Sequence, residues 1–439
     1  MPQTQGAKVG YLFPGQGAQA VGMGKQLYDE SPAAREVFHQ VDMALERSLS
    51  TILFDGPEDD LRQTINAQPG IMAVSLACIK TMEERLGDDM PQPVVTAGHS
   101  LGEYTALAVS GVLDIGDTAK LVQRRGELMQ VACDENPGTM AAIIGLDEMT
   151  LEEIAVETGT YVSNINTAEQ IVISGDIMGV ARACDLATAR GAKKAVPLRV
   201  GGAFHSGLME PARAGLIEAI NSVKFHDPQI PIVGNCSAQP LTTAEEVQRE
   251  LISQICSCVQ WKRTVDYMVD SGVNDFIEIG PGRALSGMVK RISRRSQITS
   301  VGDLESILSL ADTVEHIATE VLDVRLAETA ISKWDEAFAR AMLDGIFANA
   351  AEIDKIIAEF APGWPIGQMA VVDRNILRMA IYEIMVSEDT PPRVAVNEAV
   401  ELAKAFGGDS APRFINGVLG SVMAAASRIH TEQLETLTN

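Results

Sequence analysis

Short apolar runs alternate with longer stretches of helical periodicity from Lys8 to about Ile232. The clearest apolar runs are VGYLFPG, PVVTAGHS, AAIIGLD and QIVISGD. Strand-like runs that alternate with helix-like stretches are typical of α/β domains, because each helix carries the chain back across a largely parallel sheet. The pattern therefore predicts an α/β fold for the first part of the chain.

A second, denser set of alternating segments lies within about residues 138–200. It comprises the strand-like runs TMAAIIGLD, YVSNIN, QIVISGD and AKKAVPLRV, with helices expected from Leu151 and from Ile177. Two β-α-β-like units this close in sequence predict an inserted ferredoxin-like subdomain. Farther along, DFIEIGPG predicts a last strand and a turn before a basic helix over residues 283–295.

After about Ala311 the strand-like runs stop, and helices are expected between the Pro- and Gly-containing segments APGWPIG, DTPPR and FGGDSAP. The broad apolar face of Asp373–Val386 predicts a helix that is buried in a bundle. We therefore expect an α/β domain over residues 8–309 and an all-helical domain over residues 310–430.

Composition narrows the possible functions. A chain of 439 residues is too long for one ordinary hydrophobic core, and 46% hydrophobic residues are enough for real cores. The 35 Lys and Arg residues against 59 Asp and Glu residues give a formal charge of −24. Such a charge repels phosphate backbones and anionic lipids, so it disfavours general nucleic-acid binding.

The cysteines and the apolar runs bear on location. Six cysteines are scattered along the chain without a pair of metal-ligand motifs, which indicates a reduced, cytoplasmic protein. The N-terminus lacks the pattern of a signal peptide, and no run approaches the roughly 18 apolar residues of a spanning helix. We expect a cytoplasmic protein that neither enters nor crosses a membrane.

The segment Gly98-His99-Ser100-Leu101-Gly102 has the pattern G-x-S-x-G between the apolar run PVVTA and an apolar helix. A strand, a sharp turn and a helix are the context of a nucleophile elbow, with the amide of Leu101 placed to donate to an oxyanion. The alternative is a turn of small residues that packs a helix onto its strand. The context favours Ser100 as a nucleophile.

A serine nucleophile needs a base, and the chain contains only six histidines. His205 lies in GGAFHSGLMEP, after a predicted strand and among small residues, where an imidazole can face a cleft. A histidine satisfied in the core or on the surface is the ordinary alternative. The pattern alone leaves both possibilities open.

Five motifs occur in the order and spacing of one enzyme family. They are FPGQGAQ at 13–19, GHSLGEY at 98–104, QRRGELMQ at 123–130, GAFHS at 202–206 and VQW…GPG at 259–282. With them the α/β domain resembles the bacterial malonyl-CoA:acyl carrier protein transacylases. The resemblance implies an α/β-hydrolase-like core that carries the ferredoxin-like insertion.

The same resemblance implies a role for each matching residue. Ser100 is the nucleophile and His205 its base, while the backbone amides of Gln16 and Leu101 form the oxyanion hole. The imidazole is oriented by a backbone carbonyl, for which the matching position is Gln260. A malonyl-serine intermediate then passes its acyl group to the thiol of acyl carrier protein, and no metal or other cofactor is needed.

Arg125 is the position that bears on the substrate. A malonyl group ends in a carboxylate, and burying that charge without a partner costs several kcal/mol, so a guanidinium is its natural receptor. Family members that use malonyl groups have an arginine here, and Phe204 also resembles their version of the segment. The alternative is that Arg125 is an ordinary surface arginine.

A basic segment is a candidate docking patch for the acidic carrier protein. It comprises Lys290, Arg291, Arg294 and Arg295, although these cations also suit a solvated helix face.

The helical domain resembles a second family. Residues 373–419, with PPRVAVNEAVELAK and FINGVL, resemble the C-terminal half of the transcription antitermination factor NusB. In NusB proteins an arginine-rich first helix binds RNA together with a ribosomal protein. The corresponding stretch here, residues 313–330, contains a single arginine, Arg325. From residue 310 onward, 10 Lys and Arg against 20 Asp and Glu give a net charge of −10. Two hypotheses remain, an interaction or structural module and a retained RNA- or ribosomal-protein-binding domain.

Two other functions compete for the whole chain. The GHSLG motif also fits an α/β serine hydrolase such as an esterase or thioesterase, but that enzyme needs an acid between its serine and histidine in sequence and has no use for Arg125. The second competing function is that of a transcription-associated binding protein whose transferase half is a relic. The intact set of Ser100, His205, Arg125 and Gln16 argues against a relic.

Overall fold

The structure is a computed structural model. It describes residues 8–310, 332–364, 369–387, 390–408 and 410–437, together with positions 319, 322, 323, 326 and 366, but only the backbone of residues 88, 371 and 426–437. Arg325 and most of residues 313–330 lie outside the described residues. The chain divides into two compact units, the first Met1–Glu84 with Met90–Leu308 and the second Arg85–Asp89 with Ser309–Asn439.

A six-stranded sheet forms the centre of the first unit, with strand order β10-β9-β1-β2-β7-β8. Its strands are β1 (Lys8–Phe13), β2 (Pro93–Gly98), β7 (Ile232–Val233), β8 (Pro240–Leu241), β9 (Val273–Ile279) and β10 (Gln297–Val301). All neighbours pair in parallel except β7 and β8. Leu12, Phe13 and Ala97 are fully buried, as expected of parallel strands that are covered on both faces.

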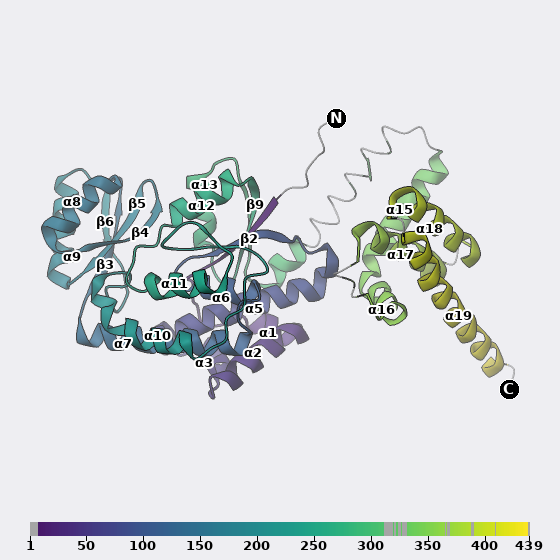
Figure 1. Ribbon diagram of the computed structural model, residues 1–439, viewed down its shortest axis with the longest axis horizontal. Coiled ribbons are helices and arrows are strands. Elements are labelled where there is room, and N and C mark those ends of the chain that lie inside the picture. The colour runs from purple at the N-terminus through teal and green to yellow at the C-terminus, as the bar shows by residue number, and fades with distance from the viewer. Residues whose placement is uncertain are drawn as a thin grey trace. The chain divides into compact units, whose positions relative to one another are not determined.

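Helices surround this sheet (Figure 1). They are α1 (Lys25–Glu30), α2 (Pro32–Ala44), α3 (Leu49–Asp55), α4 (Glu58–Arg62), α5 (Thr64–Leu86), α6 (Gly102–Val109), α7 (Ile115–Glu135), α10 (Glu210–Asn221), α11 (Ala244–Gln254), α12 (Trp261–Asp270) and α13 (Ala284–Ile292). A short 3-10 turn lies at Gly207–Met209, and another lies at Gly87–Asp89, in the part of the chain that belongs to the second unit. The basic helix expected over residues 283–295 ends at Ile292, where Ser293 takes an extended conformation, so Arg294 and Arg295 follow the helix.

A second sheet lies at one end of this unit (Figure 1). It contains β3 (Thr139–Ile144), β4 (Tyr161–Thr167), β5 (Gln170–Gly175) and β6 (Lys194–Pro197) in the antiparallel order β4-β5-β3-β6. Two helices, α8 (Glu148–Thr158) and α9 (Ile177–Ala189), complete a β-α-β-β-α-β order, and buried Ile143, Ile154 and Ile173 belong to its core. The predicted ferredoxin-like insertion is confirmed, and the runs AAIIGLD and QIVISGD belong to its antiparallel sheet.

The described part of the second unit is helical. Its elements are α15 (Lys333–Ala348), α16 (Ala350–Phe360), α17 (Val371–Tyr382), a π-helical turn at Glu383–Ser387, α18 (Pro392–Phe406) and α19 (Ala411–Leu437). Ile353, Leu377, Ala399 and Ile415 belong to one apolar core. The predicted helix over Asp373–Val386 is present, and Ile376, Ala380 and Ile384 point its apolar face into this core. The predicted fold class is therefore confirmed in both parts.

Candidate active site

Ser100 occupies a sharp turn between β2 and α6. Its φ of 52° lies in the left-handed region, which is uncommon for a residue with a side chain. The turn leaves no space beside its glycines, because a Cβ on Gly98 would lie 1.8 Å from the carbonyl carbon of Gly102, and a Cβ on Gly102 would lie 2.0 Å from the oxygen of Phe13. The two glycines of the motif are therefore required by close backbone contact, and the turn has the form of a nucleophile elbow.

His205 is in hydrogen-bonding contact with this serine. The Ser100 Oγ and His205 Nε2 atoms are 2.7 Å apart, although 105 positions separate the two residues in sequence. His205 is 5% exposed and also has a positive φ, 56°. The structure thus brings together the two residues that the sequence singled out, in the arrangement of a nucleophile and its base.

The carbonyl that orients His205 belongs to Gln254, so the assignment to Gln260 was wrong. The His205 Nδ1 atom lies 2.9 Å from the Gln254 oxygen, at the C-terminal end of α11. The Gln260 carbonyl instead accepts the first hydrogen bond of α12, from the Thr264 amide at 2.9 Å. A carbonyl at the end of a helix has no partner within that helix, and it is therefore available to an imidazole.

Burial keeps His205 neutral. Loss of water around the imidazole is the largest cause that lowers the pKa of His205 to about 3, and the positive charge of Arg125 lowers it further. The hydrogen bond to the Gln254 carbonyl acts in the opposite direction. An imidazole that is uncharged at neutral pH, with Nδ1–H donated to a carbonyl, has its Nε2 lone pair free to take the serine proton.

The backbone amides that the resemblance assigns to an oxyanion hole are those of Leu101 and Gln16. Leu101 follows Ser100 at the start of α6, and Gln16 lies in the loop after β1. Among the hydrogen bonds of the described residues, neither amide has an acceptor. By contrast, the amide of Ser100 itself donates to Asn235 Oδ1 at 2.7 Å. Unpaired amides beside a nucleophile can stabilise a developing oxyanion.

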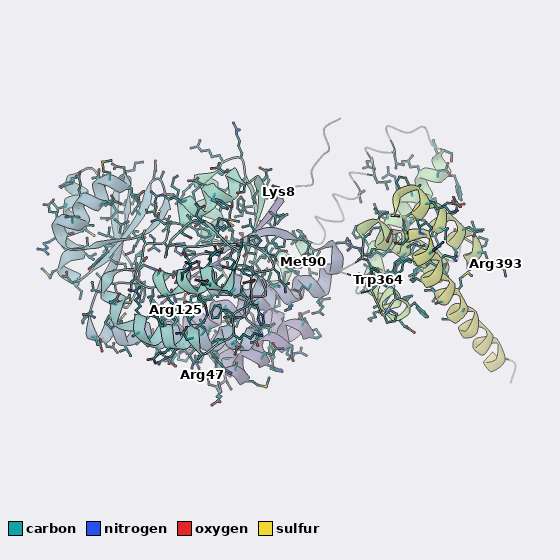
Figure 2. All side chains as sticks on the ribbon, viewed as in Figure 1. Lys8, Arg47, Met90, Arg125, Trp364 and Arg393 are labelled. Atoms are coloured by element: carbon teal, nitrogen blue, oxygen red, sulfur yellow. The ribbon has the colours of Figure 1, made fainter. Side chains whose placement is uncertain are left out.

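Arg125 lies in the interior of the first unit, on α7, and is labelled in Figure 2. Its side chain has no exposed surface. The Nη1 atom donates to Gln68 Oε1 at 2.7 Å, and Nη2 donates to Gln254 Oε1 at 2.9 Å and to Ser100 Oγ at 3.1 Å. The guanidinium also lies 5.3 Å from the centre of the Tyr104 ring. The alternative of a surface arginine is excluded by this burial.

A pocket of about 260 Å³ opens onto Ser100 and His205. It is lined by residues 14–18, by Met288 of α13, and by Met140, Asn164 and Asn166 of the ferredoxin-like subdomain. His99 also lines the pocket and contacts the subdomain, because its Nε2 atom lies 2.9 Å from Asn166 Oδ1. The site therefore lies between the main sheet and the inserted subdomain.

Sequence reasoning missed four buried polar residues around the site, namely Gln68, Glu103, Asn235 and Gln254. Gln254 is the most connected, since its Nε2 atom donates to the Ser100 carbonyl at 2.8 Å and to Glu103 Oε2 at 2.5 Å. Glu103 had a signal, because it lies inside the motif GHSLGEY on an otherwise apolar helix. The described residues hold no group of three or more His, Cys, Asp or Glu side chains suited to a metal ion.

The fold and the site together define a class of protein, the serine-dependent acyl-transfer enzymes. Members of this class combine an α/β fold with a serine on a nucleophile elbow, a neutral histidine and unpaired backbone amides. Residues 10–321 match the acyl transferase domain model, and residues 296–424 match the NusB family. The chain belongs to the acyl transferase family. Among the described residues, every helix is too short or too polar to cross a membrane.

Relatives and solved structures agree with this family. The malonyl CoA-acyl carrier protein transacylase of Bacillus subtilis (strain 168) is 42% identical over 306 residues, which cover 69% of this chain and 95% of the relative. The acyl-carrier-protein S-malonyltransferase structure from Bartonella henselae is 41% identical, with a TM-score of 0.67, and the match covers 70% of this chain and 99% of that one.

A third match is the malonyl-transacylase in complex with the acyl carrier protein of a type II polyketide synthase. That transacylase is 36% identical to this chain, with a TM-score of 0.66, and the match covers 69% of this chain and 98% of the transacylase.

The lowered pKa of His205 predicts a flat pH profile for the reactivity of Ser100. A group with a depressed pKa stays neutral above that value, so the base is lost only as the pH falls towards about 3. We expect the rate of Ser100 modification by a sulfonyl fluoride to agree within about threefold between about pH 5 and about pH 8, measured by intact mass. A histidine of ordinary pKa, about 6.5, would lose roughly thirtyfold over the same range. A half-maximal rate near pH 6.5 would contradict the prediction, and Ser100→Ala corrects for labelling elsewhere.

Proposed function

We propose that this chain is an acyl-carrier-protein S-malonyltransferase. It transfers the malonyl group of malonyl-CoA to the phosphopantetheine thiol of acyl carrier protein, a step of fatty acid biosynthesis. The observation that carries the proposal is the buried guanidinium of Arg125, whose Nη2 atom lies 3.1 Å from Ser100 Oγ. A cation behind the nucleophile suits an acyl group that ends in a carboxylate.

The first half-reaction acylates the serine. His205 Nε2 takes the proton of Ser100 as Oγ forms a bond to the thioester carbon of malonyl-CoA, and the amides of Gln16 and Leu101 stabilise the oxyanion. When the carbon–sulfur bond breaks, the imidazolium returns the proton to the leaving sulfur. Free CoA and a malonyl-serine ester result. The Gln254 carbonyl, 2.9 Å from His205 Nδ1, stabilises the imidazolium that forms.

The second half-reaction runs the same chemistry in reverse order. The carrier's phosphopantetheine thiol enters the pocket, His205 takes its proton, and the sulfur attacks the ester carbon. The carbon–oxygen bond breaks, and the proton passes to Ser100. This is ping-pong covalent catalysis by the chain's own side chains, and the proposal includes no metal or other cofactor.

The hydrolase alternative fits the site less well. An α/β hydrolase places a carboxylate at Nδ1 of its histidine, whereas here Nδ1 meets the Gln254 carbonyl. A neutral acyl group also has no use for a fully buried arginine beside the nucleophile. Transfer of a carboxylate-bearing acyl group accounts for both features.

For carrier docking we propose the edge of the pocket near α13. Ala284, Leu285 and Met288 of this helix line the pocket, and Arg283 and Arg291 are exposed at its two ends. Lys290 is partly engaged, because its Nζ atom donates to the Ser296 carbonyl at 2.9 Å. Exposed cations beside the pocket mouth suit an acidic carrier even though the whole chain is negative.

Acylation of Ser100 is the direct test of the proposed function. After brief incubation with malonyl-CoA, intact-mass measurement is expected to show one malonyl adduct on the wild-type chain and none on Ser100→Ala, because the substitution removes the attacking oxygen. The adduct should disappear on addition of phosphopantetheinylated acyl carrier protein and malonyl-carrier should appear. Absence of an adduct would exclude the transferase function, and discharge to free malonate without malonyl-carrier would identify a hydrolase.

Replacement of Arg125 should separate malonyl from acetyl groups. Arg125→Met keeps much of the buried volume and removes the charge, so a malonyl carboxylate would be buried without a partner. Because that costs several kcal/mol, we expect the single-turnover rate of Ser100 acylation by malonyl-CoA to fall on the order of a hundredfold or more, with a much smaller change for acetyl-CoA. Arg124→Met, on the exposed face of the same helix, is the control and should leave both rates unchanged. Equal losses for the two thioesters would contradict the assignment.

We place the transferase domain at residues 8–309 and the NusB-like domain at 310–430, in a cytoplasmic protein. The change of compact unit between Leu308 and Ser309 supports the boundary, and six free cysteines support a reducing compartment.

For the NusB-like domain we propose an interaction or structural role rather than RNA binding. Arg374 and Arg378 are 8% and 4% exposed, and Arg378 pairs with Asp354 at 2.8 Å, so these cations are not available to phosphates.

The charge of the NusB-like domain predicts no general affinity for RNA. With a net charge of −10 from residue 310 onward, 10 cations against 20 anions, long-range electrostatics oppose phosphate backbones. We expect the fluorescence anisotropy of a labelled single-stranded RNA to stay constant up to about 10 μM full-length chain at about 150 mM salt. Saturable binding below that concentration, weakened by added salt, would favour the retained RNA-binding hypothesis instead.

A further inference from the structure

Two buried acidic side chains lie behind the nucleophile and have no part in the proposed chemistry. Glu103 of α6 has no exposed surface, and Glu250 of α11 is 6% exposed. Burial of an isolated carboxylate is costly, so each is expected to have a structural or functional partner. Their partners differ. Glu250 Oε1 accepts from the Cys236 amide at 2.5 Å, whereas Glu103 contacts the residue that holds Arg125.

The partners of Glu103 are hydrogen-bond donors. Its Oε1 atom accepts from the Asn235 amide at 3.0 Å, and its Oε2 atom accepts from Gln254 Nε2 at 2.5 Å. Burial above all, and then the charge of Glu250, raise the pKa of Glu103 well above its ordinary value, even though the donors from Asn235 and Gln254 and the charge of Arg125 act in the opposite direction. N–H donors at both oxygens match the acceptor-only chemistry of a carboxylate.

The amide of Gln254 has one orientation that satisfies all its neighbours. Its Nε2 side faces two acceptors, the Ser100 carbonyl and Glu103 Oε2, and its Oε1 side faces the guanidinium of Arg125 at 2.9 Å. Reversing the amide would point an NH2 group at the guanidinium and an oxygen at two other oxygens. Because Arg125 can only donate and a carboxylate can only accept, the two charged groups select the same orientation from opposite sides.

We infer that Glu103 is a positioning residue that sets the preference for acyl groups bearing a carboxylate. Its carboxylate fixes the orientation of the Gln254 amide, and the Gln254 oxygen in turn holds Arg125 Nη2 towards Ser100. Glu103 touches neither the substrate nor Ser100 Oγ, so its influence passes through Gln254. This inference rests on the proposed malonyl transfer and adds a specificity residue to it.

The critical substitution is Glu103→Gln, which conserves size. Its amide oxygen can still accept from the Asn235 amide, but its NH2 group then faces Gln254 Nε2, so that two donors meet. If Gln254 turns over to relieve this contact, the conflict passes to Arg125, which loses the acceptor that holds Nη2. The guanidinium then lacks the oxygen that directs Nη2 towards the Ser100 acyl group.

The experiment measures single-turnover acylation of Ser100 by malonyl-CoA and by acetyl-CoA in the full-length chain, followed by intact mass. For Glu103→Gln we expect the malonyl-to-acetyl rate ratio to fall on the order of tenfold or more, as for the loss of an oriented hydrogen bond to a charged group. The control is Glu250→Gln, a buried acid that contacts Cys236, and it should keep the wild-type ratio. A purely structural role would lower both rates together and leave the ratio unchanged.

A second background tests whether the effect passes through Gln254. Gln254→Ala keeps the backbone carbonyl that orients His205 and removes the amide, so this variant alone should also lower the ratio. Adding Glu103→Gln to Gln254→Ala should then cause no further fall in the ratio. Additive effects would overturn the inference, as would an unchanged ratio in Glu103→Gln or Gln254→Ala.

The two levels of the proposal fail in distinguishable ways. If the wild-type chain forms no malonyl adduct, the malonyltransferase function itself is wrong. If the wild-type chain forms the adduct and discriminates against acetyl-CoA while Glu103→Gln keeps the wild-type ratio, only the role of Glu103 is wrong. If Glu103→Gln does not fold, Gln254→Ala still decides whether the amide holds Arg125.

Discussion

Burial of one positive charge organises the first unit. Removing a guanidinium from water is costly, and the cost is offset only when its donors meet well-placed acceptors. Arg125 on α7 meets Gln68 from α5 and Gln254 from α11, and it lies against Tyr104 from α6. Four helices must therefore keep their relative positions for Nη1 and Nη2 to keep these acceptors, while the buried Nε has none among the described residues. The same positions place Ser100 and His205 within 2.7 Å of each other, so one constraint supports both specificity and chemistry.

Gln254 links that charge to the base. Its backbone oxygen orients His205 from the end of α11, while its side chain contacts Arg125, Glu103 and the Ser100 carbonyl. A carbonyl in place of a carboxylate at Nδ1 leaves the imidazole without a neighbouring negative charge, and this agrees with the lowered pKa of His205. The proton acceptor thus remains neutral, and the positive charge of the site resides on Arg125, where a substrate carboxylate can use it.

The two units differ in how they bury polar groups. In the first unit Gln68, Arg125 and Gln254 form a buried polar group behind the nucleophile, and strained backbone is found at Ser100 and His205. In the second unit the apolar cluster around Leu377 and Ile415 has Arg374 and Arg378 beside it, with Arg378 held by Asp354. Buried, paired cations stabilise a helical core but do not form a surface for phosphates.

The sequence by itself determined the class of each part of the chain and the elbow at Ser100, and its motifs pointed to His205 and Arg125 through their resemblance to one enzyme family. Those features depend on local spacing: strand and helix periods, glycines required by a tight turn, and a motif around each functional residue. It did not determine which carbonyl orients His205, because Gln254 and Gln260 are both glutamines near the same motif. Only the path of the chain places the Gln254 carbonyl, which also accepts from the Ser257 amide at 3.4 Å, beside His205 Nδ1. Nor did it reveal the roles of Glu103, Gln68 and Asn235. Those roles come from side chains brought together from distant helices and loops, and only the tertiary structure decides such contacts.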